Sequence, residues 1–225
     1  MTFRRVSFSS TALVTFILLG SAVPAAAQNS DGQHQVRFGV FGQTGPTSGT
    51  AANPAGREDY SIFTYGIGAS AGLEWVRKQG WSWGVEMDGT VLAGNDSGAG
   101  NELSPNYLAT LRVRGGRHIR SDLFWYGTIG AGYLGMESKT SSIFGLNKVA
   151  DSKAGLVLGT GLEWDYKGAL IAAEYLYGDF GTFTSTAANH RYDADMHIFR
   201  LGVKFKVGHD HYDDDVARRI GRISK

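Results

Sequence analysis

Two adjacent stretches, residues 63–75 and 81–93, alternate over most of their length between apolar side chains and small or polar ones. A period of two indicates β-strands, because successive side chains of a strand point to opposite faces. Strands of soluble proteins usually contain about 5–6 residues, whereas about 9–11 tilted residues cross a bilayer as β-structure. Both stretches are closer to the second length, so they predict a membrane-spanning hairpin.

The polar row of this hairpin carries carboxylates, among them Glu74 and Glu86, at positions where a soluble barrel would have its apolar core. An apolar outside around a polar, charged inside is typical of a transmembrane β-barrel. A soluble, lipocalin-like barrel is the alternative, and it would need the opposite orientation, with the apolar row facing a ligand.

Residues 1–27 have the parts of a secretory signal peptide: a basic start at Arg4 and Arg5, an apolar middle, and small residues before Gln28. We therefore expect a barrel over residues 28–208, followed by a charged periplasmic tail over residues 209–225. The absence of cysteine argues against a disulfide scaffold. A formal net charge of +1 gives no indication of a nucleic-acid partner.

The same alternation along the rest of the chain predicts eight antiparallel strands that form an up-and-down barrel, an all-β fold. The predicted strands are Gln35–Phe41, Phe63–Trp75, Trp81–Ala93, Tyr107–Arg117, Leu123–Gly135, Ala154–Asp165, Ala169–Tyr177 and Asp195–Val207. Four long polar loops are expected at Gln43–Tyr60, Asn95–Asn106, Met136–Ser152 and Gly178–Ala194. Long loops alternate with short turns, which is typical of outer-membrane barrels with long loops outside and short periplasmic turns.

Both signs of charge are expected on the inner face in nearly equal numbers. These residues are Arg37, Glu74, Glu86, Asp88, Arg112, Arg114, Glu163, Glu174, Arg200 and Lys204. A buried charge is unfavourable unless it is paired, so we expect ion pairs that fill the lumen. A gated pore or a proton path is the alternative, although an eight-stranded barrel is only just wide enough for side chains.

Five motifs occur in order along the expected barrel. They are Val113–Gly116 (VRGG), Tyr126–Tyr133 (YGTIGAGY), Gly161–Trp164 (GLEW), Ala173–Gly181 (AEYLYGDFG) and Phe199–Phe205 (FRLGVKF). In this order they resemble the small porin-like outer-membrane β-barrel family, which includes the outer-membrane immunogenic proteins and is similar in fold to the membrane domain of OmpA. The resemblance implies the outer membrane of a Gram-negative bacterium, with lipid and lipopolysaccharide around the barrel. The pattern Arg200-x-Gly202-x-x-Phe205-x-Val207 resembles the last-strand signal that barrel-assembly machinery reads.

The expected function is structural: envelope integrity and surface display by a monomer with a plugged lumen, without a cofactor or a bound metal. An adhesin that binds an unknown extracellular partner through the long loops is the first alternative, followed by a small diffusion channel and a lipid-A-modifying enzyme. We expect no enzyme, because His118, His190 and His197 are scattered and none forms a His-x-Ser pair on a lipid-facing strand. The His/Asp-rich run at residues 209–215 could bind a divalent metal, but solvated tails of this kind are commoner.

Overall fold

A computed structural model describes residues 33–53, 56–76, 80–94, 96–98, 101–142, 145–185 and 190–207. All of them belong to one compact unit, Gly32–Lys225. The expected signal peptide, residues 1–27, and the expected tail, residues 209–225, lie outside the described residues.

The described chain consists of β-strands. They are β1 (Gln33–Asn53), β2 (Gly56–Val76), β3 (Trp81–Ala93), β4 (Asp96–Gly98), β5 (Asn101–Arg120), β6 (Leu123–Ser142), β7 (Gly145–Tyr166), β8 (Ala169–Ser185) and β9 (His190–Val207). Among the described residues, no helix has the length and hydropathy needed to span a membrane.

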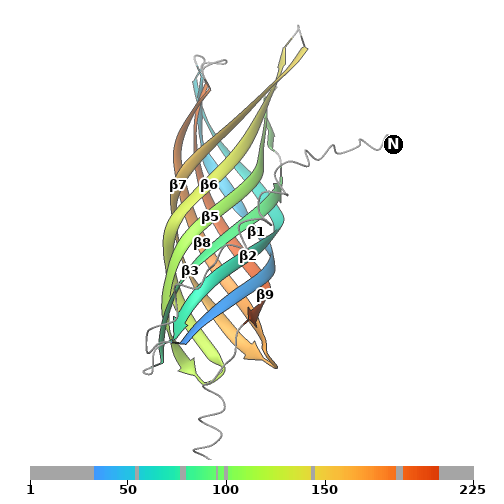
Figure 1. Cartoon of the computed structure of the whole chain (residues 1–225). Helices are drawn as coiled ribbons and strands as arrows, with labels where there is room; N and C mark the ends of the chain where they lie inside the picture. The colour runs from blue at the N-terminus through green and yellow to red at the C-terminus, as the bar shows by residue number, and fades with distance from the viewer. Residues whose placement is uncertain are drawn as a thin grey trace, which may run out of the picture. The chain divides into compact units, whose positions relative to one another are not determined.

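The strands form one closed antiparallel barrel, in which each long strand pairs with its neighbours in sequence and β1 pairs with β9 (Figure 1). Pairing of β3 with β5 closes the ring, because β4 has three residues and pairs only with the first three residues of β5. The ring therefore has eight long strands. The prediction of an eight-stranded up-and-down barrel is confirmed.

Short turns connect the strands at one end of the barrel. The β7–β8 turn uses Lys167 and Gly168 with φ angles of 53° and 87°, the left-handed conformation that a tight two-residue hairpin needs at both positions. The first and last described strands meet at this same end, where Val36 pairs with Val207. Both features mark it as the periplasmic end of an outer-membrane barrel.

The four segments expected as long loops are mostly β-structure, so most of the strand ends predicted next to these loops are wrong, whereas β3, the starts of β6 and β8 and the end of β9 lie where they were predicted. In β1–β2 the ladder continues beyond Phe41 to the pair Asn53–Gly56, and in β6–β7 it continues to Ser142–Gly145. The surface loops are thus long β-hairpins with short tips. Their polar, glycine-rich sequences lack the outward apolar row that marks the spanning strands, so the alternation did not reveal them.

The ring splits toward the hairpin end. The β2–β3 ladder stops at the pair Tyr65–Ala93, and the β7–β8 ladder stops at Leu156–Asp179. Beyond these points two separate sheets continue, one containing β1, β2, β8 and β9 and the other containing β4 to β7. The β6–β7 hairpin, yellow in Figure 1, rises away from the other hairpins at the top.

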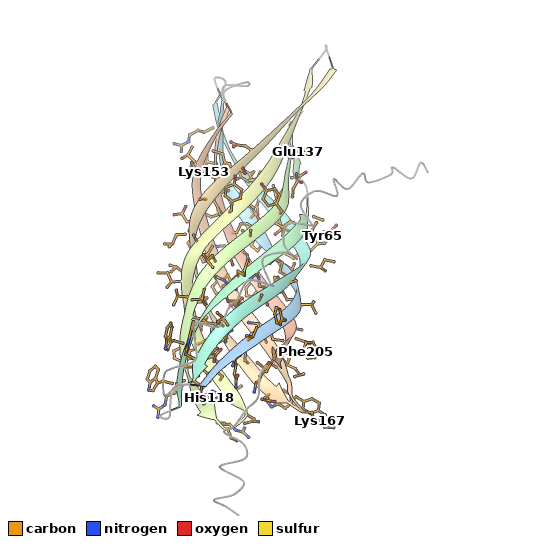
Figure 2. All side chains as sticks on the ribbon, in the orientation of Figure 1. Tyr65, His118, Glu137, Lys153, Lys167 and Phe205 are labelled. Atoms are coloured by element: carbon orange, nitrogen blue, oxygen red, sulfur yellow. The ribbon has the colours of Figure 1, made fainter. Side chains whose placement is uncertain are left out.

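The outer wall is apolar between two bands of aromatic rings. Near the short turns, Trp75 stacks on Trp83 with ring centroids 4.3 Å apart, and toward the hairpins Tyr107 lies 6.3 Å from Tyr133. Figure 2 shows His118 and Lys167 at the short-turn end and Glu137 and Lys153 near the hairpins. Aromatic rings at both interfaces around an apolar band are typical of a membrane-spanning barrel.

A cation placed on this wall tests its contact with lipid. Leu111 is 59% exposed between the two aromatic bands, so Leu111→Arg is expected to lower the free energy of unfolding in phospholipid vesicles by about 2–4 kcal/mol. Urea titration in vesicles measures the change. The matched control is Ser61→Arg, at an exposed position beyond the upper band, where the loss should be at most about 1 kcal/mol. Equal losses at the two positions would contradict a lipid-facing wall.

Candidate functional site

The lumen next to the short-turn half of the barrel contains all ten charged residues singled out from the sequence. Each of them faces inward and is at most 9% exposed. They come from seven strands, because the two-residue period of each strand brings its polar row to the inside. The members are Arg37 on β1, Glu74 on β2, Glu86 and Asp88 on β3, Arg112 and Arg114 on β5, Glu163 on β7, Glu174 on β8, and Arg200 and Lys204 on β9.

Glu163 is the centre of the part nearest the short turns. Its carboxylate lies 2.7 Å from Arg37 Nη1, 2.7 Å from Arg114 Nη2 and 3.0 Å from Lys204 Nζ. Arg37 also lies 2.6 Å from Glu74. Three cations and two carboxylates from five strands therefore meet in one layer.

Arg112 is the centre of the next layer and is fully buried. Its Nη1 lies 2.7 Å from Glu174, and its Nη2 lies 2.9 Å from Glu86 and 2.8 Å from Asp88. Arg200 binds the other oxygen of Asp88 at 3.0 Å. A planar guanidinium with several donors suits this arrangement, in which one cation bridges three carboxylates.

Glu86 joins the two layers into one network. One of its oxygens binds Arg112, and the other accepts hydrogen bonds from Arg114 at 3.0 Å and from Lys204 at 2.5 Å. The complete set has five carboxylates and five cations, so the formal charges cancel. This balance is what makes burial of so many charges tolerable, since a buried charge without a partner is strongly unfavourable.

Neutral side chains extend the network, and the sequence analysis did not assign them to it. Gln43 accepts hydrogen bonds from Arg200 Nε at 2.9 Å and from Thr90 at 3.2 Å. Tyr126 donates to Glu174 at 3.1 Å, and its ring lies 3.9 Å below the Arg114 guanidinium. Gln43 was predicted as the first residue of a loop, and only the continuation of β1 into the hairpin brings it inside.

An apolar layer fills the lumen between this network and the hairpin end. It is a cluster of buried side chains, in contrast to the polar interior that the strand pattern predicts. The members are Tyr60, Ile62, Leu92, Leu108, Leu134, Met136, Val157, Leu176, Phe180, Phe183, Ala194, Met196 and Ile198. Several lie in segments expected as loops, where their spacing gave no outward apolar row to recognise. The lumen therefore has two levels: a lower, ionic level near the short turns and an upper, apolar level toward the hairpins.

Little open volume accompanies the network. A cavity of about 20 Å³ lies beside Ser70, Glu86, Tyr126, Glu174 and Lys204. A cavity needs about 10–15 Å³ of this kind to hold one water molecule. The cavity is therefore large enough for a single water and far smaller than a ligand pocket.

The histidines considered for catalysis are not brought together in the described part of the chain. The His118 ring lies 4.9 Å from the Phe124 ring near the short turns, whereas His197 Nδ1 is 2.7 Å from the Tyr175 hydroxyl on the outer wall. The side chain of His190 and the tail at residues 209–215 lie outside the described side chains. Within the described residues, no group of three His, Cys, Asp or Glu side chains could hold a metal ion.

Loss of the central cation should destabilise the barrel. Arg112→Leu leaves Glu86, Asp88 and Glu174 facing one another without their shared partner, so we expect unfolding to become easier by about 3–5 kcal/mol. Urea titration in vesicles measures this change. Arg120→Leu is the control, because Arg120 is 73% exposed and lies 3.4 Å from Asp122. The free energy of unfolding of Arg120→Leu should fall by less than about 1 kcal/mol. A similarly small effect of Arg112→Leu would contradict a stabilising network.

Three solved structures are similar to this chain. OprG from Pseudomonas aeruginosa is similar in structure, with a TM-score of 0.52 and 14% identity over 78% of this chain and 96% of OprG. Ail of Yersinia pestis, in complex with the heparin analogue sucrose octasulfate, gives a TM-score of 0.45 and 17% identity over 79% of this chain and all of Ail. Neisserial surface protein A gives a TM-score of 0.43 and 14% identity over 76% of this chain and 97% of that protein's chain.

No curated protein matches the sequence. The family described as "Outer membrane protein beta-barrel domain" matches residues 13–206, which include all the described strand residues except Val207. The match, the closed eight-stranded ring and the apolar outer wall agree on location as well as fold. This chain belongs to the outer-membrane protein β-barrel family of Gram-negative bacteria.

Proposed function

We propose that this protein is a structural barrel that contributes to envelope integrity and displays its β-hairpins at the cell surface, while its lumen stays closed. The observation that carries the proposal is the two-level lumen. Ten paired charges fill the lower level, and a continuous apolar cluster fills the upper level. An ion would have to cross both levels to pass through the barrel.

Neither level favours conduction. In the lower level each cation is within 3.0 Å of at least one carboxylate oxygen, so its charge is already neutralised by the protein. The upper level offers apolar side chains in place of the water or carbonyl oxygens that an ion requires. A diffusion channel of this diameter would need both levels to rearrange.

An enzymatic role has less support than a structural one. Hydrolysis by a serine nucleophile requires a histidine within hydrogen-bond reach. His197 is bonded to Tyr175 and His118 lies against Phe124, and no serine–histidine hydrogen bond is present among the described side chains. The proposal therefore assigns the chain no catalytic step and no cofactor.

The hairpins supply the surface that the proposal assigns to display. Outward residues beyond the upper aromatic band are polar on β2, where Arg57, Asp59 and Ser61 are exposed, while the inward Tyr60 and Ile62 are buried. Recognition of an extracellular partner through these hairpins is the alternative role. Lipid and lipopolysaccharide as surroundings, insertion by barrel-assembly machinery, and a monomeric state complete the proposal.

Electrical recording and a deletion strain test the two halves of this proposal. The purified full chain in planar bilayers is expected to give no conductance steps, because an apolar layer lies in series with a neutralised ionic layer. A large porin inserted in the same bilayer serves as the positive control. Regular single-channel steps from the wild-type protein would contradict a closed lumen.

Deletion of the gene is expected to increase sensitivity to detergent and to large antibiotics, and the wild-type gene should restore resistance. A variant whose β1–β2 hairpin is shortened between residues 50 and 59, which are cross-strand partners, keeps Tyr60 of the apolar layer and separates the two roles. It should restore resistance, because the spanning strands remain complete. Unchanged sensitivity in the deletion strain would contradict the integrity role, whereas restoration only by the full-length hairpin would favour partner recognition.

A further inference from the structure

Two glycines leave an open depression on the outer wall near the short turns. Gly115 on β5 and Gly127 on β6 face outward and are direct partners across the two strands. A Cβ atom built on Gly115 would meet no atom within 4 Å, and one on Gly127 would meet only the Gly159 carbonyl oxygen at 3.9 Å. We call this pair the glycine depression. Its neighbours along the two strands, Val113 and Ile129, are large and exposed.

Two tryptophans flank the glycine depression, and the ring of each contacts the neighbouring strand on the side away from the two glycines. Trp83 pairs with Gly115 on one side, but its ring stacks on Trp75 of β2 on the other, with an interplanar angle of 15°. Trp125, next to Gly127 on the outer row of β6, donates its indole N–H to Thr160 of β7 at 3.0 Å. These contacts hold both indoles away from the glycines, so the depression stays open.

A cation without a protein partner lies beside the glycine depression. Arg117 is on the same outward row of β5 as Gly115, is exposed, and pairs across the strands with Trp81 and Trp125. Within the described part of the chain, Arg117 forms no hydrogen bond, ion pair or ring contact.

The other basic side chains described at the short-turn end of the barrel, which we call the rim, do have partners. Lys206 binds Asp165 at 2.5 Å, Arg120 lies 3.4 Å from Asp122, and Lys167 lies over the Tyr166 ring. Among the basic side chains that the structure describes at this rim, Arg117 is therefore the one that is left to bind an anion from outside the protein. The wall around it faces the bilayer, in which the anion available at the depth of the aromatic band is a lipid phosphate.

We propose that this surface binds one glycerophospholipid of the periplasmic leaflet. An acyl chain lies over the glycine depression between Trp83 and Trp125, and the phosphate is bound by Arg117. The planar guanidinium matches two phosphate oxygens at once. The indole of Trp125 already has its hydrogen-bond partner in Thr160, so the ring can present an apolar face to the chain.

Native mass spectrometry of the full barrel released from detergent measures the bound lipid. With dioleoylphosphatidylglycerol as the probe, the wild type should retain one lipid. Arg117→Gln should lower retention about tenfold, as expected for loss of a charge-assisted contact. Gly115→Leu, which fills the depression, should lower it as well. Dioleoylglycerol has the same acyl chains without the phosphate and should be lost from all variants.

Matched controls come from the same wall and the same rim. Gly42→Leu fills another outward glycine with open space whose cross-strand partners are the apolar Ile67 and Leu201, and Arg120→Gln removes a cation that is already paired. Both should retain lipid as the wild type does. Heat-modifiable gel migration verifies that each variant is folded.

Equal retention by the wild type and by Arg117→Gln would overturn the proposal, as would retention of dioleoylglycerol at the level of the phospholipid. An effect of Arg117→Gln without an effect of Gly115→Leu would also overturn it, because the chain would then not occupy the depression.

Discussion

Burial of ten charges inside a narrow cylinder is the constraint on which the rest of this structure depends. Each charge is tolerable only with its partner in place, and partners are in place only if the strands pair in one register. Two ion pairs join direct cross-strand partners: Glu86 faces Arg112 where β3 and β5 close the ring, and Glu174 faces Arg200 between β8 and β9. A slip of one residue at either seam would turn these side chains toward lipid, so the network specifies closure of the barrel.

The apolar face of the strands is the outer one near the short turns and the inner one toward the hairpins. Near the short turns the outside is apolar and the inside is charged, as a bilayer requires. Toward the hairpins β2 has Asp59 and Ser61 outside and Tyr60 and Ile62 inside, which is the arrangement of a soluble protein. The upper sheets are thus held together by a hydrophobic core, and that core also covers the ionic network from above.

Small residues make room for the large side chains that cross the lumen. A Cβ atom at Gly161 would come within 2.5 Å of the Tyr126 ring, and one at Gly39 would come within 2.7 Å of the Lys204 side chain. Glycine at these two positions lets Tyr126 reach Glu174 and lets Lys204 reach Glu86. The glycine content that the sequence shows is therefore part of the packing of the plug.

The sequence by itself determined the fold class, the number of long strands and the face on which each charged residue lies. These follow from the two-residue period, which is a local property of an extended chain. Only the tertiary structure decided which acid meets which base, since Arg37 and Glu163 are 126 residues apart in the chain. It also brought Gln43 inside and placed Gly115, Gly127 and Arg117 together on the outer wall. These results depend on strand register and on the length of each ladder, and the strand pattern failed at the hairpins because the apolar row there changes from the outer face to the inner one.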